Sequence, residues 1–169
     1  YLTKTFTSTD NWSIKKLHRR IVLSATYRQN SEFREDAATV DRDNKLLWRY
    51  PRRRLESEAI RDSMLAVSGR LRGEVGGPSV KPYQPDKYWE NLNFPQRDYV
   101  ADSGDNQFRR GLYTWWQRTF LPPAFAAFDA PSREDPCPER VRSNIPQQAL
   151  VLLNDPSHVE AARCLAARI

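Results

Sequence analysis

The chain has 169 residues, enough for one domain with its own core, and its aromatic content of 11% excludes an intrinsically disordered protein. Its net charge is +6, and arginine outnumbers lysine by 21 to 6, which suits ion pairs within the fold or anionic ligands outside it. We predict that residues 1–169 form a single domain without a membrane span, because no apolar run approaches the roughly 18 residues that a span requires.

The first part of the chain is predicted to hold two helices. Leu2 and Phe6 have helical spacing and belong to the end of an earlier element, and Asp10 or Asn11 is expected to cap the next helix. That helix covers residues 12–26 and carries basic residues opposite an apolar stripe. The stripe consists of Ile14, Leu17, Ile21 and Ala25, and the basic face consists of Lys15, Lys16, Arg19 and Arg20.

The middle of the chain combines one helix with long loops. Residues 27–50 are predicted to form turns around a short apolar island at 46–48, and a helix follows over residues 53–72. Gly73 and the glycines after it end this helix, and residues 73–106 form a long loop that is either functional or held by its own side chains. The apolar stripe of the helix is Ile60, Met64, Val67 and Leu71. The aromatic residues of the loop are Tyr83, Tyr88, Trp89 and Tyr99.

The last part of the chain has the clearest helical pattern. Residues 108–120 have strand propensity, and we favour an extended segment with buried aromatics over a helix. A short helix is predicted over 124–128, and an αα-hairpin joins residues 147–153 to residues 157–169, with Pro146 in its first turn. The apolar face of the last helix is Val159, Ala162, Leu165 and Ile169. The predicted fold is therefore mainly α: an irregular helical domain with long ordered loops and at most one short pair of strands.

Arg52, Arg53 and Arg54 form the densest positive run in the sequence. Guanidinium groups bind phosphate, sulfate or carboxylate through paired hydrogen bonds, so this run is a candidate docking site for an anionic ligand. Acidic residues lie close by in sequence, and the favoured interpretation pairs the arginines with them instead. These acidic residues are Glu56, Glu58, Asp62 and Asp129.

A second candidate region interleaves basic and aromatic residues. The basic residues Arg109, Arg110 and Arg118 flank the aromatic residues Tyr113, Trp115 and Trp116. Such a cluster can hold a sugar ring against an indole face, or it can stack the bases of single-stranded nucleic acid. The favoured interpretation is a hydrophobic core stabilised by cation–π contacts, without a ligand. Carbohydrate binding is the second choice and nucleic-acid binding the third.

Glu58 and Asp62 supply a third candidate, because they lie one turn apart on one helical face. Paired carboxylates can perform acid–base catalysis or hold a metal ion. Arginines stand beside both residues, so charge compensation is the favoured interpretation. The competing hypothesis is an enzyme, a hydrolase or a redox catalyst, in which one open pocket collects Arg54, Glu58, Asp62, Asp129 and Arg142.

Motifs for other chemistries are absent from the sequence. It has no GxSxG nucleophile motif and no glycine-rich phosphate loop, and His18 and His158 are isolated from other candidate ligands. We therefore assign no catalytic residue and no metal ligand. Cys137 and Cys164 make no CxxC pair, and they allow one disulfide without requiring it.

Four stretches of the sequence together resemble the domain of unknown function 1553 family, also called the planctomycete PSD domain. The resemblance covers nearly the whole chain in order and spacing, with one mild departure: Arg142–Gln148 reads RSNIPQQ where the family usually has RTNTPLQ. The matching residues are Trp12–Arg19 with Ser24–Gln29; Asn44–Arg49 with Pro51–Leu55 and Glu58–Asp62; Gly76–Val80; and Arg109–Tyr113 with Phe128–Pro131, Arg142–Leu150 and Leu153–Pro156.

The resemblance implies that this chain is the central and C-terminal part of a larger exported, planctomycete-type protein, located in the periplasm, at the cell surface or outside the cell. Family members often carry an N-terminal cytochrome c module, so any haem c is expected in an upstream domain and no cofactor in this chain. No catalytic residues are established for the family, so none is carried over.

The expected function is that of a non-catalytic accessory or scaffold domain. It is expected to bind an anionic polysaccharide or to dock a cytochrome c module, and its other partners are domains of the same polypeptide. The alternatives are part of an enzyme built on the Arg/Asp/Glu cluster, and a basic nucleic-acid-binding module, which is the least favoured.

Overall fold

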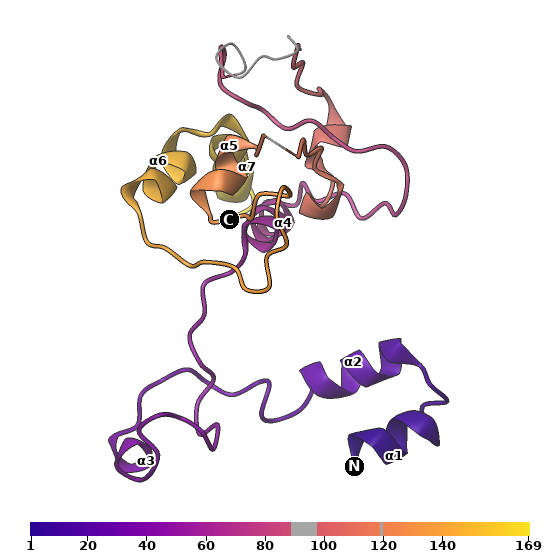
Figure 1. Ribbon diagram of the computed structural model, residues 1–169, viewed down its shortest axis with the longest axis vertical. Coiled ribbons are helices and arrows are strands. Elements are labelled where there is room, and N and C mark those ends of the chain that lie inside the picture. The colour runs from indigo at the N-terminus through magenta and orange to yellow at the C-terminus, as the bar shows by residue number, and fades with distance from the viewer. Residues whose placement is uncertain (89–97, 119) are drawn as a thin grey trace. The chain divides into compact units, whose positions relative to one another are not determined.

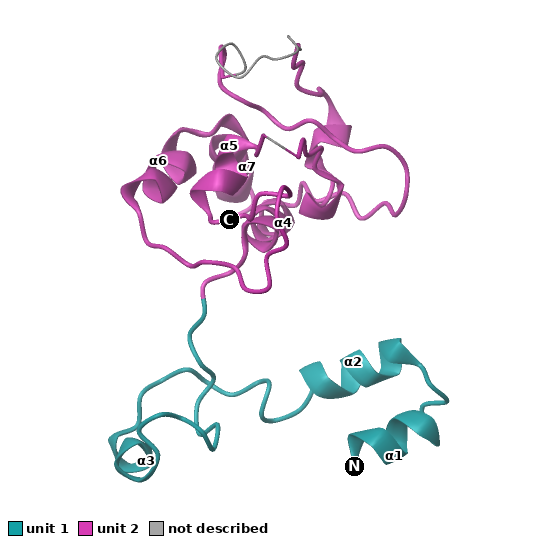
Figure 2. Ribbon diagram, viewed as in Figure 1, with its two compact units in different colours: residues 1–53 teal, residues 54–169 magenta. Residues whose placement is uncertain are grey.

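Figure 1 shows the chain as a computed structural model, in which residues 1–88, 98–118 and 120–169 are described. The chain divides into two compact units, Tyr1–Arg53 (unit 1) and Arg54–Ile169 (unit 2), which are coloured separately in Figure 2. The predicted mainly α fold is confirmed, since pairing between strands in the described part is confined to isolated bridges. The prediction that the chain is one domain stays a prediction. None of the helices in the described ranges is long and apolar enough to cross a membrane.

Unit 1 begins with two short helices, α1 (Leu2–Thr7) and α2 (Ile14–Val22), which contact one another. The cap of α2 is Ser13, whose hydroxyl accepts a hydrogen bond from the Lys16 N–H at 3.4 Å. The predicted cap at Asp10 or Asn11 is therefore wrong. The α2 helix also ends earlier than predicted.

The turn between α1 and α2 explains why Asp10 is not a cap. Asn11 and Trp12 have positive φ angles of 47° and 59°, so the chain reverses sharply before the helix begins. Asp10 is buried, and its carboxylate accepts two hydrogen bonds from the Arg20 guanidinium, at 2.9 and 3.3 Å. This ion pair fixes the turn against α2.

The segment after α2, predicted to form turns, contains a short helix, α3 (Glu35–Val40). Hydrogen bonds made by Asp41 and Trp48 fix the backbone at the end of this helix and in the turn that follows it. The Asp41 carboxylate accepts hydrogen bonds from the N–H groups of Lys45 and Leu46, and the Trp48 indole donates to the Asp41 carbonyl at 2.7 Å. Residues 46–48, the predicted apolar island, are thus part of a turn that these hydrogen bonds stabilise.

Unit 2 is built around α4 (Ser57–Val67), a shorter helix than predicted. Gly69, with a φ of 75°, ends it four residues before the predicted stop at Gly73. The most buried positions are Ser57, Arg61, Leu65 and Ser68. The buried face is therefore displaced from the predicted apolar stripe, because neighbouring segments cover the helix on the side that carries Arg61 and Leu65.

In its described part the long loop after α4 is organised by side chains, which is one of the two alternatives predicted for it. The Arg109 guanidinium donates to the carbonyl oxygens of Gly76 and Pro78, and the Tyr113 hydroxyl accepts from the Gly76 N–H at 2.8 Å. Val80 and Thr114 form an isolated parallel bridge in place of a strand pair. Trp89, which we had assigned to this loop, lies outside the described residues.

The segment predicted to be extended over 108–120 is interrupted by short turns of 3-10 helix. These are η2 (Asp105–Phe108) and η3 (Gly111–Tyr113), and the backbone becomes extended at Thr114. The Gly111 N–H donates to the Asp62 carboxylate at 2.6 Å, and a Cβ at Gly111 would stand only 3.0 Å from the Glu58 Cα. Glycine therefore permits the close approach of this segment to α4.

The C-terminal helices agree with the predicted pattern. They are α5 (Pro123–Ala127), α6 (Pro146–Asn154) and α7 (Pro156–Ala166), each with proline in its first turn. In Figure 1, α4, α5, α6 and α7 lie together, and α7 contacts both α4 and α6. The predicted apolar face of α7 is wrong: Ala161 is its buried residue, while Val159 and Ile169 are exposed. The helix is rotated so that His158 and Ala161 face its neighbours.

Candidate functional site

Unit 1 contains a surface hollow of about 290 Å³, here called the arginine–tyrosine pocket. It forms where the segment after α2 meets residues 47–53, and the Tyr50 N–H donates to the Asn30 carbonyl at 3.0 Å to join the two. Its polar and aromatic lining comprises Ser24, Thr26, Tyr27, Gln29, Arg49, Tyr50 and Arg53, and its apolar lining comprises Ile21, Leu47 and Pro51. The charged lining residues are thus both arginines.

Arg49 is held in place from several sides. The Asn44 side chain donates to the Arg49 carbonyl at 2.9 Å and accepts from the Arg49 N–H at 3.2 Å. The guanidinium lies 4.8 Å from the ring centre of Trp48 and 5.4 Å from that of Phe33. Because the cation is fixed by rings and not by a carboxylate, its hydrogen-bonding capacity is not used up by an acidic partner.

The two tyrosines present aromatic surface beside these arginines. The ring centres of Tyr27 and Tyr50 are 5.8 Å apart, with an interplanar angle of 69°, and both side chains are exposed. In the described residues of unit 1, Arg49 and Arg53 have no ion pair. Guanidinium groups bind sulfate or carboxylate, and aromatic faces can pack against a sugar ring. The pocket therefore combines the groups that recognise an anionic sugar.

The predicted site residues are divided between the units. Arg52 and Arg53 lie in unit 1, where Arg53 lines the pocket and Arg52 is exposed outside it. The other predicted residues lie in unit 2. These are Arg54, Glu58, Asp62, Arg109, Arg110, Tyr113, Trp115, Trp116, Asp129 and Arg142.

Asp129 joins two loops of unit 2. Its carboxylate accepts hydrogen bonds from the Ser143 N–H and hydroxyl, both at 2.7 Å, and lies 3.9 Å from the Arg54 guanidinium. The Ser143 contacts, together with the charge of Arg54, hold the pKa of Asp129 below its usual value. Arg54 also donates to the Asn144 side chain at 3.0 Å. Arg142 borders the same crevice, whose volume is only about 10 Å³.

Glu58 and Asp62 have separate partners. Arg140 donates two hydrogen bonds to Glu58, at 2.7 and 3.1 Å. Burial acts to raise the pKa of Glu58, but the hydrogen bonds of Arg140 and other donors outweigh it and lower that pKa. Asp62 accepts from Gly111 and lies 3.5 Å from the Arg110 guanidinium. The structure therefore brings Arg54, Asp129 and Arg142 together but places the carboxylates of Glu58 and Asp62 against other groups.

The basic and aromatic cluster of unit 2 makes the contacts expected of a core that is stabilised by cation–π interactions. The Arg109 guanidinium stacks 3.9 Å from the Tyr113 ring centre, while Lys81 lies 5.4 Å from the Trp115 ring. Trp116 packs on Phe125 with ring centres 5.5 Å apart, and a further cation, Arg133, lies over its indole at 4.2 Å. These rings are thus engaged by cations from the protein itself.

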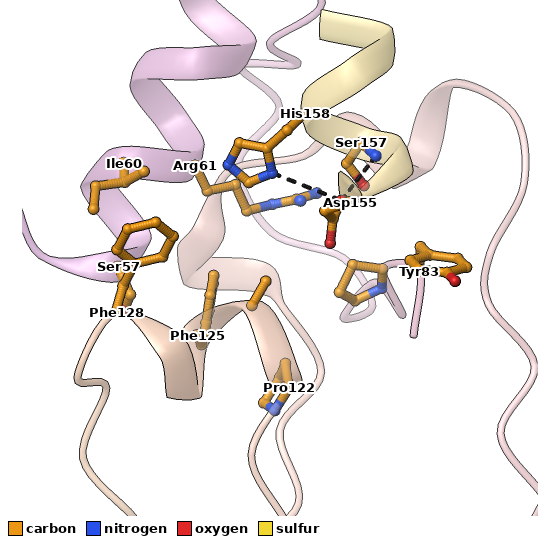
Figure 3. Close-up of a pocket in the computed structure, with 12 residues that line it drawn as sticks. Ser57, Ile60, Arg61, Tyr83, Pro122, Phe125, Phe128, Asp155, Ser157 and His158 are labelled. Carbon is orange, nitrogen blue, oxygen red and sulfur yellow. Dashed lines mark hydrogen bonds and ion pairs between the residues drawn. The ribbon is translucent and has the colours of Figure 1, made fainter. Parts of the chain in front are cut away.

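Unit 2 also has an enclosed cluster that the sequence analysis missed, consisting of Arg61, Asp155 and His158. Figure 3 shows the His158 ring and the Arg61 guanidinium turned toward the Asp155 carboxylate. His158 Nδ1 lies 3.7 Å from an Asp155 oxygen, and Asp155 also caps α7 by accepting from the Ser157 N–H at 2.8 Å. Apolar walls from Phe125, Phe128 and neighbouring residues surround the cluster.

The charged side chains of this cluster lie in the interior of unit 2. Burial lowers the pKa of Arg61. Burial also acts to raise the pKa of Asp155, but its contacts with His158 and Ser157 prevail and lower it. The space open to the centre of a small molecule is about 20 Å³, enough for one water. The available sequence signal was the Asp155-Pro-Ser-His158 spacing, which puts both side chains on the first turn of α7.

These carboxylates predict loss of stability in acid. Glu58, Asp129 and Asp155 all have lower pKa values in the folded chain than ordinary carboxyl groups. Their contribution is present above the unfolded pKa, near about pH 4, and is lost as the pH falls through the folded values. We expect the urea midpoint, followed by circular dichroism, to fall between neutral pH and about pH 3. A Glu58→Gln/Asp129→Asn/Asp155→Asn variant should show a much smaller fall, and an equal fall would contradict this assignment.

The described residues offer no grouping of three or more His, Cys, Asp or Glu side chains that could hold a metal ion. Cys137 and Cys164 are both free thiols, and Cys137 is exposed. The candidate functional site is the arginine–tyrosine pocket, where two arginines meet exposed tyrosine rings, and the Arg61–Asp155–His158 cluster is enclosed.

Comparison with known protein families finds one match, to the model described as PSD1, protein of unknown function (DUF1553), over residues 1–169. No curated protein and no solved structure matches the chain.

Proposed function

The chain belongs to the PSD1 (DUF1553) family, whose function is unknown, and we propose that it is a non-catalytic accessory domain that binds anionic polysaccharide. The proposal is supported mainly by the arginine–tyrosine pocket, in which Arg49 and Arg53 meet the exposed rings of Tyr27 and Tyr50. In keeping with this ligand class, we place its action in the periplasm or at the cell surface, alongside other domains of the same polypeptide.

Each part of the pocket has a distinct role in the proposal. Arg49 and Arg53 bind sulfate or carboxylate groups through charge-assisted hydrogen bonds, which are the strongest contacts available on this surface. Tyr27 and Tyr50 pack against the sugar ring, and Thr26 and Gln29 supply hydrogen-bonding groups for hydroxyls. Because Asn44 and the rings of Phe33 and Trp48 already position Arg49, little side-chain ordering is left for binding.

The proposal is tested by affinity electrophoresis of the protein in gels that contain dextran sulfate, polygalacturonate or neutral dextran. We expect retardation in the two anionic gels and none in neutral dextran. The Arg49→Ala/Arg53→Ala variant should bind at least about tenfold more weakly, because each hydrogen bond to a charged group contributes roughly 1.5–3 kcal/mol. Tyr27→Ala, made in the parent protein, should also weaken binding because it removes the ring. Tyr27→Phe keeps the ring and should bind nearly as the parent does.

The matched control is Arg28→Ala/Arg42→Ala, which removes the same charge from unit 1 without touching the lining of the pocket. If the control weakens binding as much as the pocket variant does, net charge and not the pocket holds the polymer. Retardation by DNA or RNA in preference to the anionic polysaccharides would favour a nucleic-acid-binding module, and absence of retardation on every polymer would remove the proposal.

A further inference from the structure

The positive charge of the chain is concentrated at its N-terminal end. Residues 1–28 contain six basic residues and one acidic residue, whereas the remaining 141 residues are nearly neutral. The basic residues are Lys4, Lys15, Lys16, Arg19, Arg20 and Arg28. The acidic residue, Asp10, is buried and paired with Arg20. The helical hairpin of α1 and α2 therefore carries most of the net charge of +6.

Large apolar side chains are exposed on the same hairpin. Trp12 is 65% exposed, Ile14 is 62% exposed and Val22 is 42% exposed. In an α-helix, residues seven positions apart share a face, so Ile14 and Ile21 line one side of α2, and Val22 lies at the edge of that side next to Lys15. Lys16 and Arg19 lie away from Ile14 and Ile21. The hairpin thus presents an amphipathic surface, here called the basic–apolar face, defined by Trp12, Ile14, Val22, Lys15, Lys16 and Arg19.

The mixture of basic and apolar side chains on this face limits the class of partner that can bind it. Polysaccharides and nucleic acids supply anionic groups, but they offer no aliphatic layer in which Ile14 and Val22 can be buried. The interface of a lipid bilayer supplies both, because anionic headgroups lie directly above acyl chains. We therefore propose that the basic–apolar face docks the protein on the surface of a membrane that contains anionic lipids. This proposal is independent of the polysaccharide site, which uses different side chains.

The geometry matches a peripheral attachment. The apolar side chains enter the boundary between headgroups and acyl chains, and the Lys15 and Arg19 side chains extend toward the phosphates. A tryptophan such as Trp12 favours this boundary, where its ring is in an apolar layer and its N–H stays hydrated. Each basic residue near such a surface contributes a salt-sensitive attraction. No spanning helix is needed for this attachment.

The test is co-sedimentation of the protein with vesicles of phosphatidylcholine alone, or of phosphatidylcholine mixed with phosphatidylglycerol. We expect binding to the mixed vesicles, reduced by salt, and little binding to phosphatidylcholine. Lys15→Glu/Arg19→Glu should weaken binding by at least about tenfold, since each basic residue contributes roughly fivefold at such a surface and the variant reverses two of them. Ile14→Ser/Val22→Ser should also weaken binding while keeping the charge.

The matched control is Arg42→Glu/Arg52→Glu, which makes the same charge change at exposed positions outside the hairpin and should keep most vesicle binding. Arg49→Ala/Arg53→Ala should also keep it, which separates this proposal from the polysaccharide site. Equal losses in the Arg42→Glu/Arg52→Glu control and the Lys15→Glu/Arg19→Glu variant would reduce the effect to net charge and overturn the proposal.

A second measurement identifies a protein occupant of the same face. Val22→Cys, in a Cys137→Ser/Cys164→Ser background, is labelled with an environment-sensitive fluorophore. We expect a solvent-exposed spectrum without vesicles and a blue shift when the mixed vesicles are added. A blue-shifted spectrum before any lipid is present would show that a protein surface already covers α2, and the membrane proposal would then fail.

Discussion

Replacing Asp155 with alanine is expected to lower the free energy of unfolding by about 3 kcal/mol. The substitution removes the cap of α7, because the Asp155 carboxylate accepts from the Ser157 N–H at 2.8 Å. It also leaves Arg61, a residue that is 8% exposed, without the negative charge of Asp155, which favours the charged guanidinium. Breaking a buried charge interaction from one side costs more than the interaction contributes, because the remaining ion is stranded away from water.

Asp155→Asn separates the two contributions. The amide oxygen can still cap α7, but the negative charge beside Arg61 and His158 is lost. We expect a loss between that of the alanine variant and the parent, measured by urea unfolding followed by circular dichroism. If Asp155→Ala costs no more than the roughly 1 kcal/mol of a simple cap, the charge of Asp155 contributes nothing to packing α4 against α7.

Leu65→Ala is expected to cost about 3 kcal/mol, within the range found when buried leucines are truncated. The Leu65 side chain is 1% exposed and lies at the centre of the face that α4 buries in unit 2. Its removal loses apolar contacts and leaves a cavity that a close-packed interior fills only in part. Thermal or urea unfolding of the variant measures this loss directly.

Val67→Ala is the matched control on the same helix. Val67 is 55% exposed, so its truncation should cost well under about 1 kcal/mol. The comparison is informative because the sequence pattern put Val67, and not Leu65, inside the protein. Equal losses at the two positions would mean that the buried face of α4 is the one that the pattern predicted.

Much of the helical framework could be predicted from local signals. Pro146 indicated where α6 begins, since a missing N–H costs nothing in a first turn, and the Asn154–Pro156 segment indicated where it ends. The long loop after α4 was also predicted, with its own side chains as one of two alternatives for its role. The helix boundaries depend on residues that are neighbours in sequence, which is why they can be recognised without the fold, whereas the bonds from Arg109 and Tyr113 to Gly76 join residues that are 33 and 37 positions apart.

The orientation of the helices could not be predicted in this way. Apolar residues surround α4 and α7 on more than one side, and neighbouring segments select the face that becomes buried. In α4 that face includes Ser57 and Arg61, polar residues that a hydrophobic pattern assigns to the surface. The cap at Ser13 was missed for a similar reason, because Arg20 engages Asp10 from a later turn.

The candidate site was partly visible in the sequence. The run of arginines drew attention to the segment that contains Arg53, and Arg49 stands just before it. Tyr27 could not be linked to this run, because it enters the pocket only when residues 27–30 meet Tyr50. Which arginines face a carboxylate and which face open solvent is decided by tertiary contacts.

The loop that the Arg109 side chain holds will behave unusually in hydrogen-exchange measurements. Exchange reports only on amide protons, yet the bonds from Arg109 to Gly76 and Pro78, and from the Tyr99 hydroxyl to Pro82, end on carbonyl oxygens. Such bonds fix the path of the backbone at these carbonyl groups without protecting an amide proton, whereas the Gly76 and Val80 amides are protected because their N–H groups donate to Tyr113. At the amides of this loop that make no such bond, fast exchange is therefore not a sign of disorder.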